Sequence, residues 1–190
     1  MFSGAPHLLQ QGGVWYMFYA DRPDIRVATA SNIGGPYSAG SVVLSPSVAW
    51  ETFRVDEPYV FQRSDGKWVL VYMGDAGGTT EQVGYATADA VTGPYTKYAG
   101  NPVLQFGPAG SFDAGTIADP WAVELNGVSY IGYTVSSSKS YPWQTAYATT
   151  TDWVTFVKHN IVLPLSSSGW DANNTFRGAV TRINDTYVFA

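Results

Sequence analysis

The feature that most constrains this chain is a four-part pattern that occurs three times along it. Each unit opens with a small or acidic pair, a proline and an apolar run, as in "GAPHLL" at Gly4, "DEPYVF" at Asp56 and "ADPWAV" at Ala118. A second apolar run follows: "VWYMFYA", "KWVLVYMG" and "VSYIGYTV". The third part reads "IRVATAS", "QVGYATA" and "QTAYATT", and the fourth "SVVL", "NPVL" and "NIVL". Self-similarity at about 60 residues is typical of a repeat architecture.

These runs have the composition of short β-strands. Val, Tyr, Trp and Thr fill them, and Gly, Pro, Asn and Asp separate them. Four-stranded units in tandem predict an all-β fold, a β-propeller of four-stranded antiparallel blades; a sandwich is the alternative. We expect a single partial propeller domain over residues 1–190, with blades at about 1–50, 51–110 and 111–170 and an incomplete fourth at 171–190.

Composition narrows the classes of function. Of the 190 residues 45% are hydrophobic, 15% aromatic and 13% charged, with a net charge of −5. The absence of a basic run argues against nucleic acid as a partner, and no run approaches the ~20 apolar residues of a membrane span. Without cysteine there is no disulfide or zinc–thiolate site. No signal peptide is visible at the first residue, so the location is undecided; a piece of a polysaccharide-degrading enzyme would be secreted or periplasmic.

Acidic residues recur where the first strand of a unit begins. In a propeller these strands line the central channel, so their leading residues converge at one mouth. Asp56 and Glu57 come from the second unit and Asp119 from the third. Alignment on the proline matches Glu57 with Asp119, Ala5 and Gly178. The expected convergent set is Asp56, Glu57, Asp119 and Arg177.

A pair of carboxylates at one pocket suits glycoside hydrolysis, in which one protonates the leaving oxygen and another activates water or attacks the sugar. Asp56, Glu57 and Asp119 are therefore the candidate catalytic residues. Because aromatic faces stack on sugar rings, the candidate substrate-binding residues are His7, Trp121, Trp143 and Arg177. The alternative is that these residues are structural. An Asp that precedes a proline often caps a turn, and Arg177 could simply pair with one of the acids. We expect Trp50, Trp68 and Trp153 in the core, and Asp65 and Asp75 as solvated turn residues.

The chain resembles the five-bladed propeller glycoside hydrolases of the arabinanase–xylosidase and invertase–levansucrase kinds. The resemblance rests on "DEPYVFQRSDGKWVLVYMG", "QVGYATADAVTGPYTKYAGNPVL" and "GTIADPWAVELNGVSYIGYTV". It implies a base Asp on the first blade, an Asp on a middle blade that tunes the acid's pKa, and a Glu as general acid. Asp119 resembles the middle-blade Asp, and Asp56 or Glu57 matches another member. "GAPHLL" carries no acid at the base position.

Two functions follow. The first is a glycosidase acting on pentose- or fructose-containing oligo- or polysaccharide; the alternative is a non-catalytic carbohydrate-binding or self-assembling propeller fragment. A Ser-His-Asp hydrolase ranks far behind, because no G-x-S-x-G elbow occurs. No metal-binding residues are assigned, but some related propellers hold a cation in the channel, so a structural Ca²⁺ bound by oxygen atoms is kept open.

Three blades and a fraction would leave apolar surfaces uncovered at both ends. One is the face of the first blade, with Val14, Trp15, Tyr16 and Phe18, and the other is the half-blade "TRINDTYVFA". Exposed strand edges and apolar faces promote association. We therefore expect a homo-oligomer formed through the open blade edges.

Overall fold

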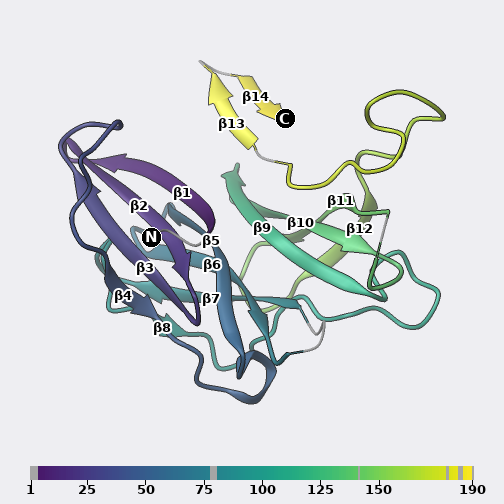
Figure 1. Cartoon of the computed structure of the whole chain (residues 1–190), viewed down its shortest axis with the longest axis horizontal. Helices are drawn as coiled ribbons and strands as arrows, with labels where there is room; N and C mark the ends of the chain where they lie inside the picture. The colour runs from purple at the N-terminus through teal and green to yellow at the C-terminus, as the bar shows by residue number, and fades with distance from the viewer. Residues whose placement is uncertain (1–3, 78–80, 141, 179, 184–185, 190) are drawn as a thin grey trace.

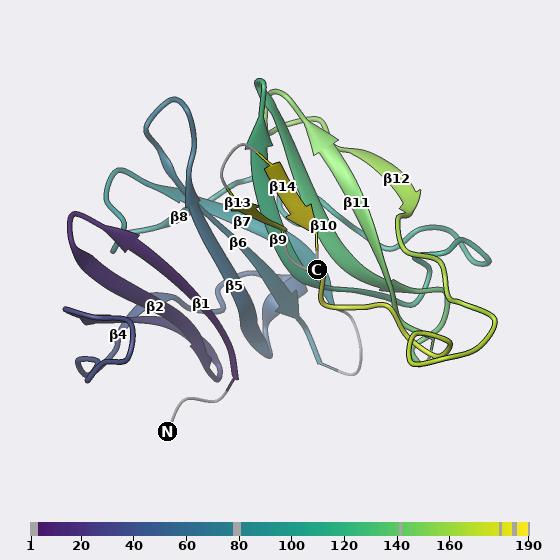
Figure 2. The same ribbon diagram turned by 90° about the horizontal axis from the view of Figure 1, so that it is seen from above.

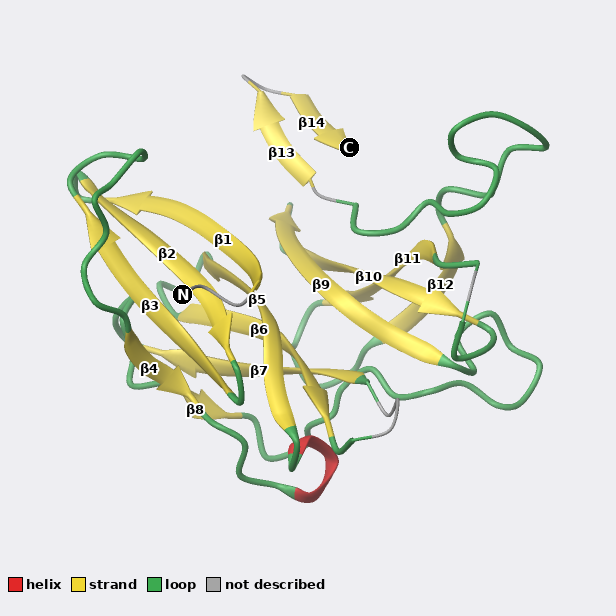
Figure 3. Ribbon diagram, in the orientation of Figure 1, coloured by secondary structure: helices red, strands yellow, loops and turns green. Residues whose placement is uncertain are grey.

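The computed structural model describes the backbone of residues 4–77, 81–140, 142–178, 180–183 and 186–189, and side chains as far as Val180. Within these ranges the regular secondary structure is β-strand apart from a single 3₁₀ turn, Ala49–Glu51 (Figure 3). No helix in the described part has the length and apolar character needed to cross a membrane.

Three antiparallel sheets of four strands follow one another along the chain, each with its strands in sequential order (Figure 1). The first contains β1 (Gly4–Gln11), β2 (Val14–Asp21), β3 (Asp24–Ala30) and β4 (Ser41–Leu44). The second contains β5 (Arg54–Gln62), β6 (Trp68–Asp75), β7 (Gln82–Ala88) and β8 (Thr96–Lys97). The third contains β9 (Thr116–Leu125), β10 (Val128–Ser136), β11 (Gln144–Thr150) and β12 (Val157–Ile161). A two-stranded sheet of β13 (Val180–Ile183) and β14 (Thr186–Phe189) completes the order.

Tight turns explain why these segments form hairpins rather than longer strands. Asn126 and Gly127 join β9 to β10, and both have positive φ, +52° and +76°. This is the backbone of a type I′ turn, whose twist matches that of the flanking strands. Gly12 and Gly13 join β1 to β2 in the same way, with φ of +57° and +81°.

The sheets are arranged as blades, with the first strand of each nearest the centre. β5 packs against both β1 and β9, and β9 also contacts β13 (Figures 1 and 2). One apolar core lies between the first two blades and includes Phe18, Leu70 and Tyr72. A second lies between the second and third blades and includes Tyr85, Tyr133 and Trp153. The propeller fold class predicted from the sequence is therefore confirmed, with three blades and part of a fourth.

One residue that the sequence analysis placed on an exposed face is buried. Phe18, placed by the sequence analysis on an open face of the first blade, is fully buried in the core that this blade shares with the second. The reason is strand alternation: Phe18 faces the neighbouring blade, whereas Met17 and Tyr19 face the other side of the sheet, where Tyr37 packs on them. The side chains of the final half-blade "TRINDTYVFA" lie outside the described residues.

Candidate active site

The inner strands share one irregularity near their beginnings. In each of the first three, two residues face a single residue on the next strand: Ala5 and Pro6 face Tyr19, Glu57 and Pro58 face Tyr72, and Asp119 and Pro120 face Tyr133. These are β-bulges, which bend a strand and re-aim a side chain.

The bulges place one residue of each inner segment in the left-handed backbone region. The φ angles are +44° at Ala5, +53° at Glu57, +47° at Asp119 and +59° at Arg177. By this criterion Arg177 is the residue of the fourth inner segment that corresponds to Glu57. The proline-based alignment placed Gly178 at that position and was wrong by one residue. Such conformations cost a non-glycine residue about 1–3 kcal/mol each and cluster at functional sites.

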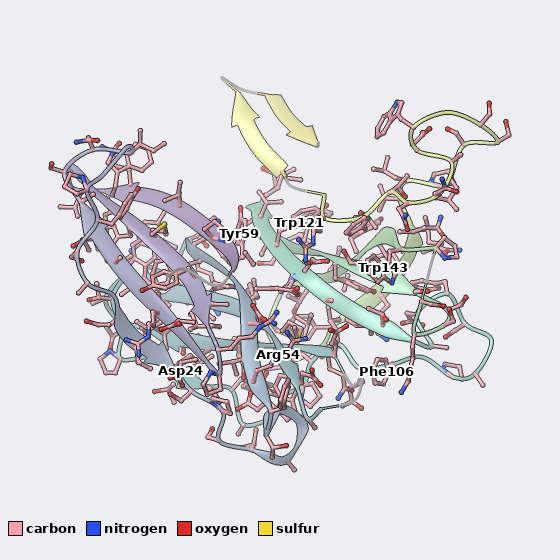
Figure 4. The ribbon with its side chains drawn as sticks, in the orientation of Figure 1. Asp24, Arg54, Tyr59, Phe106, Trp121 and Trp143 are labelled. Carbon is pink, nitrogen blue, oxygen red and sulfur yellow. The ribbon has the colours of Figure 1, made fainter. Side chains whose placement is uncertain are left out.

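The four left-handed residues converge on one cavity of about 230 Å³. Its lining combines carboxylates, an arginine, aromatic rings and prolines from all four inner segments. The lining residues are Ala5, Pro6, His7, Glu57, Pro58, Tyr59, Asp119, Pro120, Trp121, Arg177 and Gly178. Tyr59 and Trp121 lie near one another, while Arg54, the first residue of β5, lies away from them (Figure 4). We call this cavity the channel pocket.

Glu57, Asp119 and Arg177 form the polar centre of the channel pocket. The Asp119 backbone N–H donates to Glu57 Oε2 at 2.6 Å. Arg177 Nε lies 2.9 Å from Asp119 Oδ1, and Arg177 Nη2 lies 3.7 Å from Glu57 Oε1. The two carboxylate side chains are only 13% and 14% exposed, whereas the arginine is 61% exposed. One guanidinium therefore contacts both candidate acids from the solvent side.

The pKa of Glu57 is raised well above its ordinary value. Burial is the largest cause, and the negative charge of Asp119 and a side-chain hydrogen bond with it act in the same direction. The hydrogen bond from the Asp119 N–H opposes the shift, and the charge of Asp56 adds to it. The raised pKa favours a proton on Glu57, while Arg177 pairs closely with Asp119.

Asp56, the other candidate acid, lies outside the channel pocket lining. Its side chain is 2% exposed, and its Oδ2 accepts from Arg22 Nε at 2.7 Å and Arg54 Nη1 at 3.0 Å. Its Oδ1 accepts the backbone N–H of Glu57 at 2.9 Å. The bulge aims Glu57 into the channel pocket, and the lining does not include Asp56. Of the two, the structure brings Glu57 to Asp119, and it gives Asp56 the contacts of a structural ion pair.

His7 lies in the channel pocket, as a substrate-binding candidate should. Its Nε2 donates to the carbonyl of Val60 at 2.9 Å, and its ring lies 4.0 Å from that of Tyr59. Burial lowers the pKa of His7 to about 4, against the smaller opposite effect of this hydrogen bond. The imidazole is therefore neutral at physiological pH and forms an aromatic wall with Tyr59. The sequence analysis did not single out Tyr59, although its place two residues after Glu57 corresponds to that of Trp121 after Asp119.

The two candidate tryptophans have different positions. Trp121 lines the channel pocket, and its indole lies directly over Gly132 of β10, where a Cβ would stand 1.9 Å from Trp121 Cε2. Trp143 is not part of the lining; its ring packs edge-on against Phe176 at 5.2 Å. Its backbone N–H donates to Asn174 Oδ1 at 2.9 Å. Trp143 therefore supports the segment that leads to Arg177.

The donor set does not fit a calcium ion in the channel. Ca²⁺ takes six to eight oxygen ligands. The described residues contain no group of three or more His, Cys, Asp or Glu side chains that could hold a metal ion. The two channel carboxylates are instead paired with the Arg177 guanidinium.

The fold is a β-propeller similar to that of several solved glycoside hydrolases. The structure is similar to a family 117 glycoside hydrolase produced by the marine bacterium Zobellia galactanivorans, with a TM-score of 0.68 and 20% identity over 83% of this chain and 55% of that one. It is similar to an α-L-arabinofuranosidase from Clostridium thermocellum, with a TM-score of 0.67 and 15% identity over 97% and 59% of the two chains. For a GH32 β-fructofuranosidase from Bombyx mori the TM-score is 0.66, with 16% identity over 98% and 40%.

These similarities confirm, at the level of the fold, the resemblance seen in the sequence. For three of the solved structures that it matches, the chain spans between 55% and 60% of their own length. No protein-family model and no curated protein sequence matches the chain.

Proposed function

We propose that the channel pocket hydrolyses glycosidic bonds in pentose- or fructose-containing oligo- or polysaccharides. The observation that carries this proposal is the contact between Glu57 and Asp119, which brings two carboxylate side chains together in one pocket and raises the pKa of Glu57. Glu57 is the general acid, and its proton goes to the leaving glycosidic oxygen as the bond to the sugar carbon breaks. Asp119 keeps the role that the resemblance implies for the middle-blade Asp: it raises the pKa of Glu57 and orients the sugar, while a water molecule attacks the sugar carbon and loses its proton to solvent.

The rest of the channel pocket suits a sugar ring. His7, Tyr59 and Trp121 supply aromatic faces, and sugar C–H groups pack well on such faces. Arg177 offers donors to hydroxyl groups at the open side, where it is 61% exposed. The sugar class is supported by the named arabinofuranosidase and β-fructofuranosidase of similar fold, although fold alone does not fix a substrate.

The second candidate function is non-catalytic carbohydrate binding. It is favoured by the side chains at the other two left-handed positions, Ala5 and Arg177, because neither supplies a third carboxylate. Arg177 also forms ion pairs with both acids, which would restrain them in a purely binding site. In this function Glu57 and Asp119 accept hydrogen bonds from sugar hydroxyl groups and no bond is broken.

The two functions separate in one set of measurements. Hydrolysis of aryl α-L-arabinofuranosides, aryl β-xylosides and sucrose is followed for the wild type and for Glu57→Gln and Asp119→Asn, with calorimetric binding of arabino-, xylo- and fructo-oligosaccharides in parallel. Asp89→Asn is the matched control, because Asp89 is an exposed surface acid paired with Lys67. Each channel variant should lose at least about 100-fold in rate, as expected when a general acid or the residue that tunes its pKa is replaced.

Three outcomes are informative. Hydrolysis that both channel variants abolish and the control keeps supports the enzyme. Sugar binding by the wild type without hydrolysis supports the binding protein. Hydrolysis that survives both substitutions at the full wild-type rate refutes the proposed roles of Glu57 and Asp119.

A further inference from the structure

A long segment between β12 and β13 folds back on the third blade beside the channel. It runs over residues 162–178 and is seen at the upper right of Figure 1. The Val162 N–H donates to the carbonyl of Thr145 on β11, and the Thr175 N–H donates to the carbonyl of Trp143, both at 2.9 Å. Thr145 Oγ1 donates to the carbonyl of Thr175 at 2.7 Å. Both ends of the segment are thus fixed to one strand edge.

This segment encloses a second cavity of about 280 Å³. Its most unusual member is Trp170, which is 93% exposed although it also lines the cavity. Tryptophan is highly buried on average, and a bare indole leaves a large apolar face in water. The lining also includes two apolar residues, Leu163 and Pro164, and two polar ones, Asp171 and Thr175.

The second cavity adjoins the channel pocket. Gly178 lines both cavities, and Phe176 lines the second one while the next residue, Arg177, lines the first. A ligand that fills the channel pocket and extends past Arg177 therefore reaches the second cavity without leaving the protein surface. This continuity points to one extended ligand rather than to two separate ones.

We propose that the second cavity is an accessory subsite for a further sugar unit of the chain whose end occupies the channel pocket, with Trp170 as its stacking platform. This inference rests on the proposed carbohydrate ligand but not on hydrolysis. At about 280 Å³ the cavity lies just below the ~300 Å³ at which drug-sized ligand pockets begin, so it suits a small unit such as one ring.

The chemistry of the lining selects a neutral polyol. A sugar ring has an apolar C–H face for the indole and a rim of hydroxyl groups that can donate to the Asp171 carboxylate. Asp171 Oδ2 accepts from Ser166 Oγ at 2.7 Å, which holds this carboxylate toward the loop. The cavity lining includes neither lysine nor arginine, so a phosphate or carboxylate ligand would meet an uncompensated negative charge at Asp171.

The test measures how affinity depends on the length of the ligand. Calorimetry with mono- to pentasaccharides of the arabino, xylo and fructo series is carried out on the wild type, Trp170→Ala and Phe53→Ala. Phe53 is the control, since it is an exposed aromatic residue outside both cavities. An aromatic contact of ~0.5–1.5 kcal/mol corresponds to about a 2- to 13-fold change in Kd. We expect Trp170→Ala to weaken the longer oligosaccharides by this factor and to leave the monosaccharide unchanged.

The outcomes of this test are independent of those for hydrolysis. A length-dependent loss in Trp170→Ala supports the subsite even if the wild type has no hydrolytic activity. Equal affinities of wild type and Trp170→Ala for every length overturn the subsite, while hydrolysis by the wild type would still support the channel pocket. A wild type that binds no oligosaccharide overturns the subsite. A change in sedimentation with Trp170→Ala also overturns it, because the indole would then contact a second copy of the chain.

Discussion

Replacing Asp56 by Asn separates the structural role that its contacts indicate from the catalytic role that the sequence left open. The substitution keeps the shape of the side chain and removes its charge. In the wild type this carboxylate is 2% exposed and accepts from Arg54, which is itself 13% exposed, and from Arg22, which is 57% exposed. Asn at this position would leave both guanidinium groups with a weaker acceptor.

The cost follows from the two contacts. A hydrogen bond to a charged group contributes about 1.5–3 kcal/mol when buried, which applies to Arg54. An ion pair with an exposed partner contributes about 0–1 kcal/mol, which applies to Arg22. Arg54 keeps Asp75 and Glu81 as partners, so its charge is not stranded. We expect Asp56→Asn to lose about 1.5–4 kcal/mol of unfolding free energy, or about 3–16 °C in Tm for a chain of this size.

Urea unfolding followed by tryptophan fluorescence measures the loss directly, with the surface variant Asp89→Asn as the control, expected within about 0.5 kcal/mol of the wild type. Below the unfolding transition, the folded Asp56→Asn protein should keep most of its channel function, and Glu57→Gln should lose it without loss of stability. Unchanged stability together with abolished function in Asp56→Asn would refute the reasoning, because Asp56 would then act in the chemistry and not in the scaffold.

Three further predictions concern the channel pocket and the blade edges. Gly132→Ala should cost about 1–3 kcal/mol in thermal unfolding and weaken sugar binding, because its Cβ would displace Trp121; an unchanged Kd would contradict this. Since folding raises the pKa of Glu57, the stability that Glu57 contributes is present at low pH and lost as pH rises through the folded-state pKa. The Glu57→Gln variant should not show this loss. In urea unfolding at several pH values, the stability of Glu57→Gln relative to the wild type should therefore grow with pH. Self-association through open blade edges, where Leu8 and Val42 are exposed, should appear in sedimentation at tens of micromolar, and a stable monomer there would refute it.

Much of the fold could be predicted because each blade carries the same local signals. Strand-forming runs separated by turn residues determine the hairpins independently of the neighbouring blades. The repeat period of the sequence then indicates where each blade begins. The core positions of Trp68 and Trp153 were also predictable, and both are buried. Asp75 was not: it reads as a turn residue, yet it ends β6 directly opposite Arg54 of β5, pairs with that arginine and is buried. Long-range ion pairs leave no local pattern.

The candidate site was predictable in its location but not in its register. The proline that follows Ala5, Glu57 and Asp119 marks the bulge in the first three blades. In the fourth no proline is present, so the alignment fell on Gly178, and only the backbone angle shows that Arg177 is the equivalent residue. The choice between Asp56 and Glu57 likewise depends on which face of β5 meets the channel, and sequence alone does not fix that.

The backbone strain that the inner strands share does not by itself mark a catalytic residue. A left-handed non-glycine residue invites a catalytic explanation, since such strain is stored at functional sites. Yet Ala5, whose methyl group has no acid–base or hydrogen-bonding chemistry, has nearly the same φ as Asp119, +44° against +47°. The strain therefore belongs to the way an inner strand bends toward the channel, and every blade bears it whatever side chain it carries there. The blades differ in the side chain that this left-handed position carries. The chemistry of the channel pocket therefore depends on the pairing of Glu57, Asp119 and Arg177, and substitutions that keep the backbone and change only those groups test it.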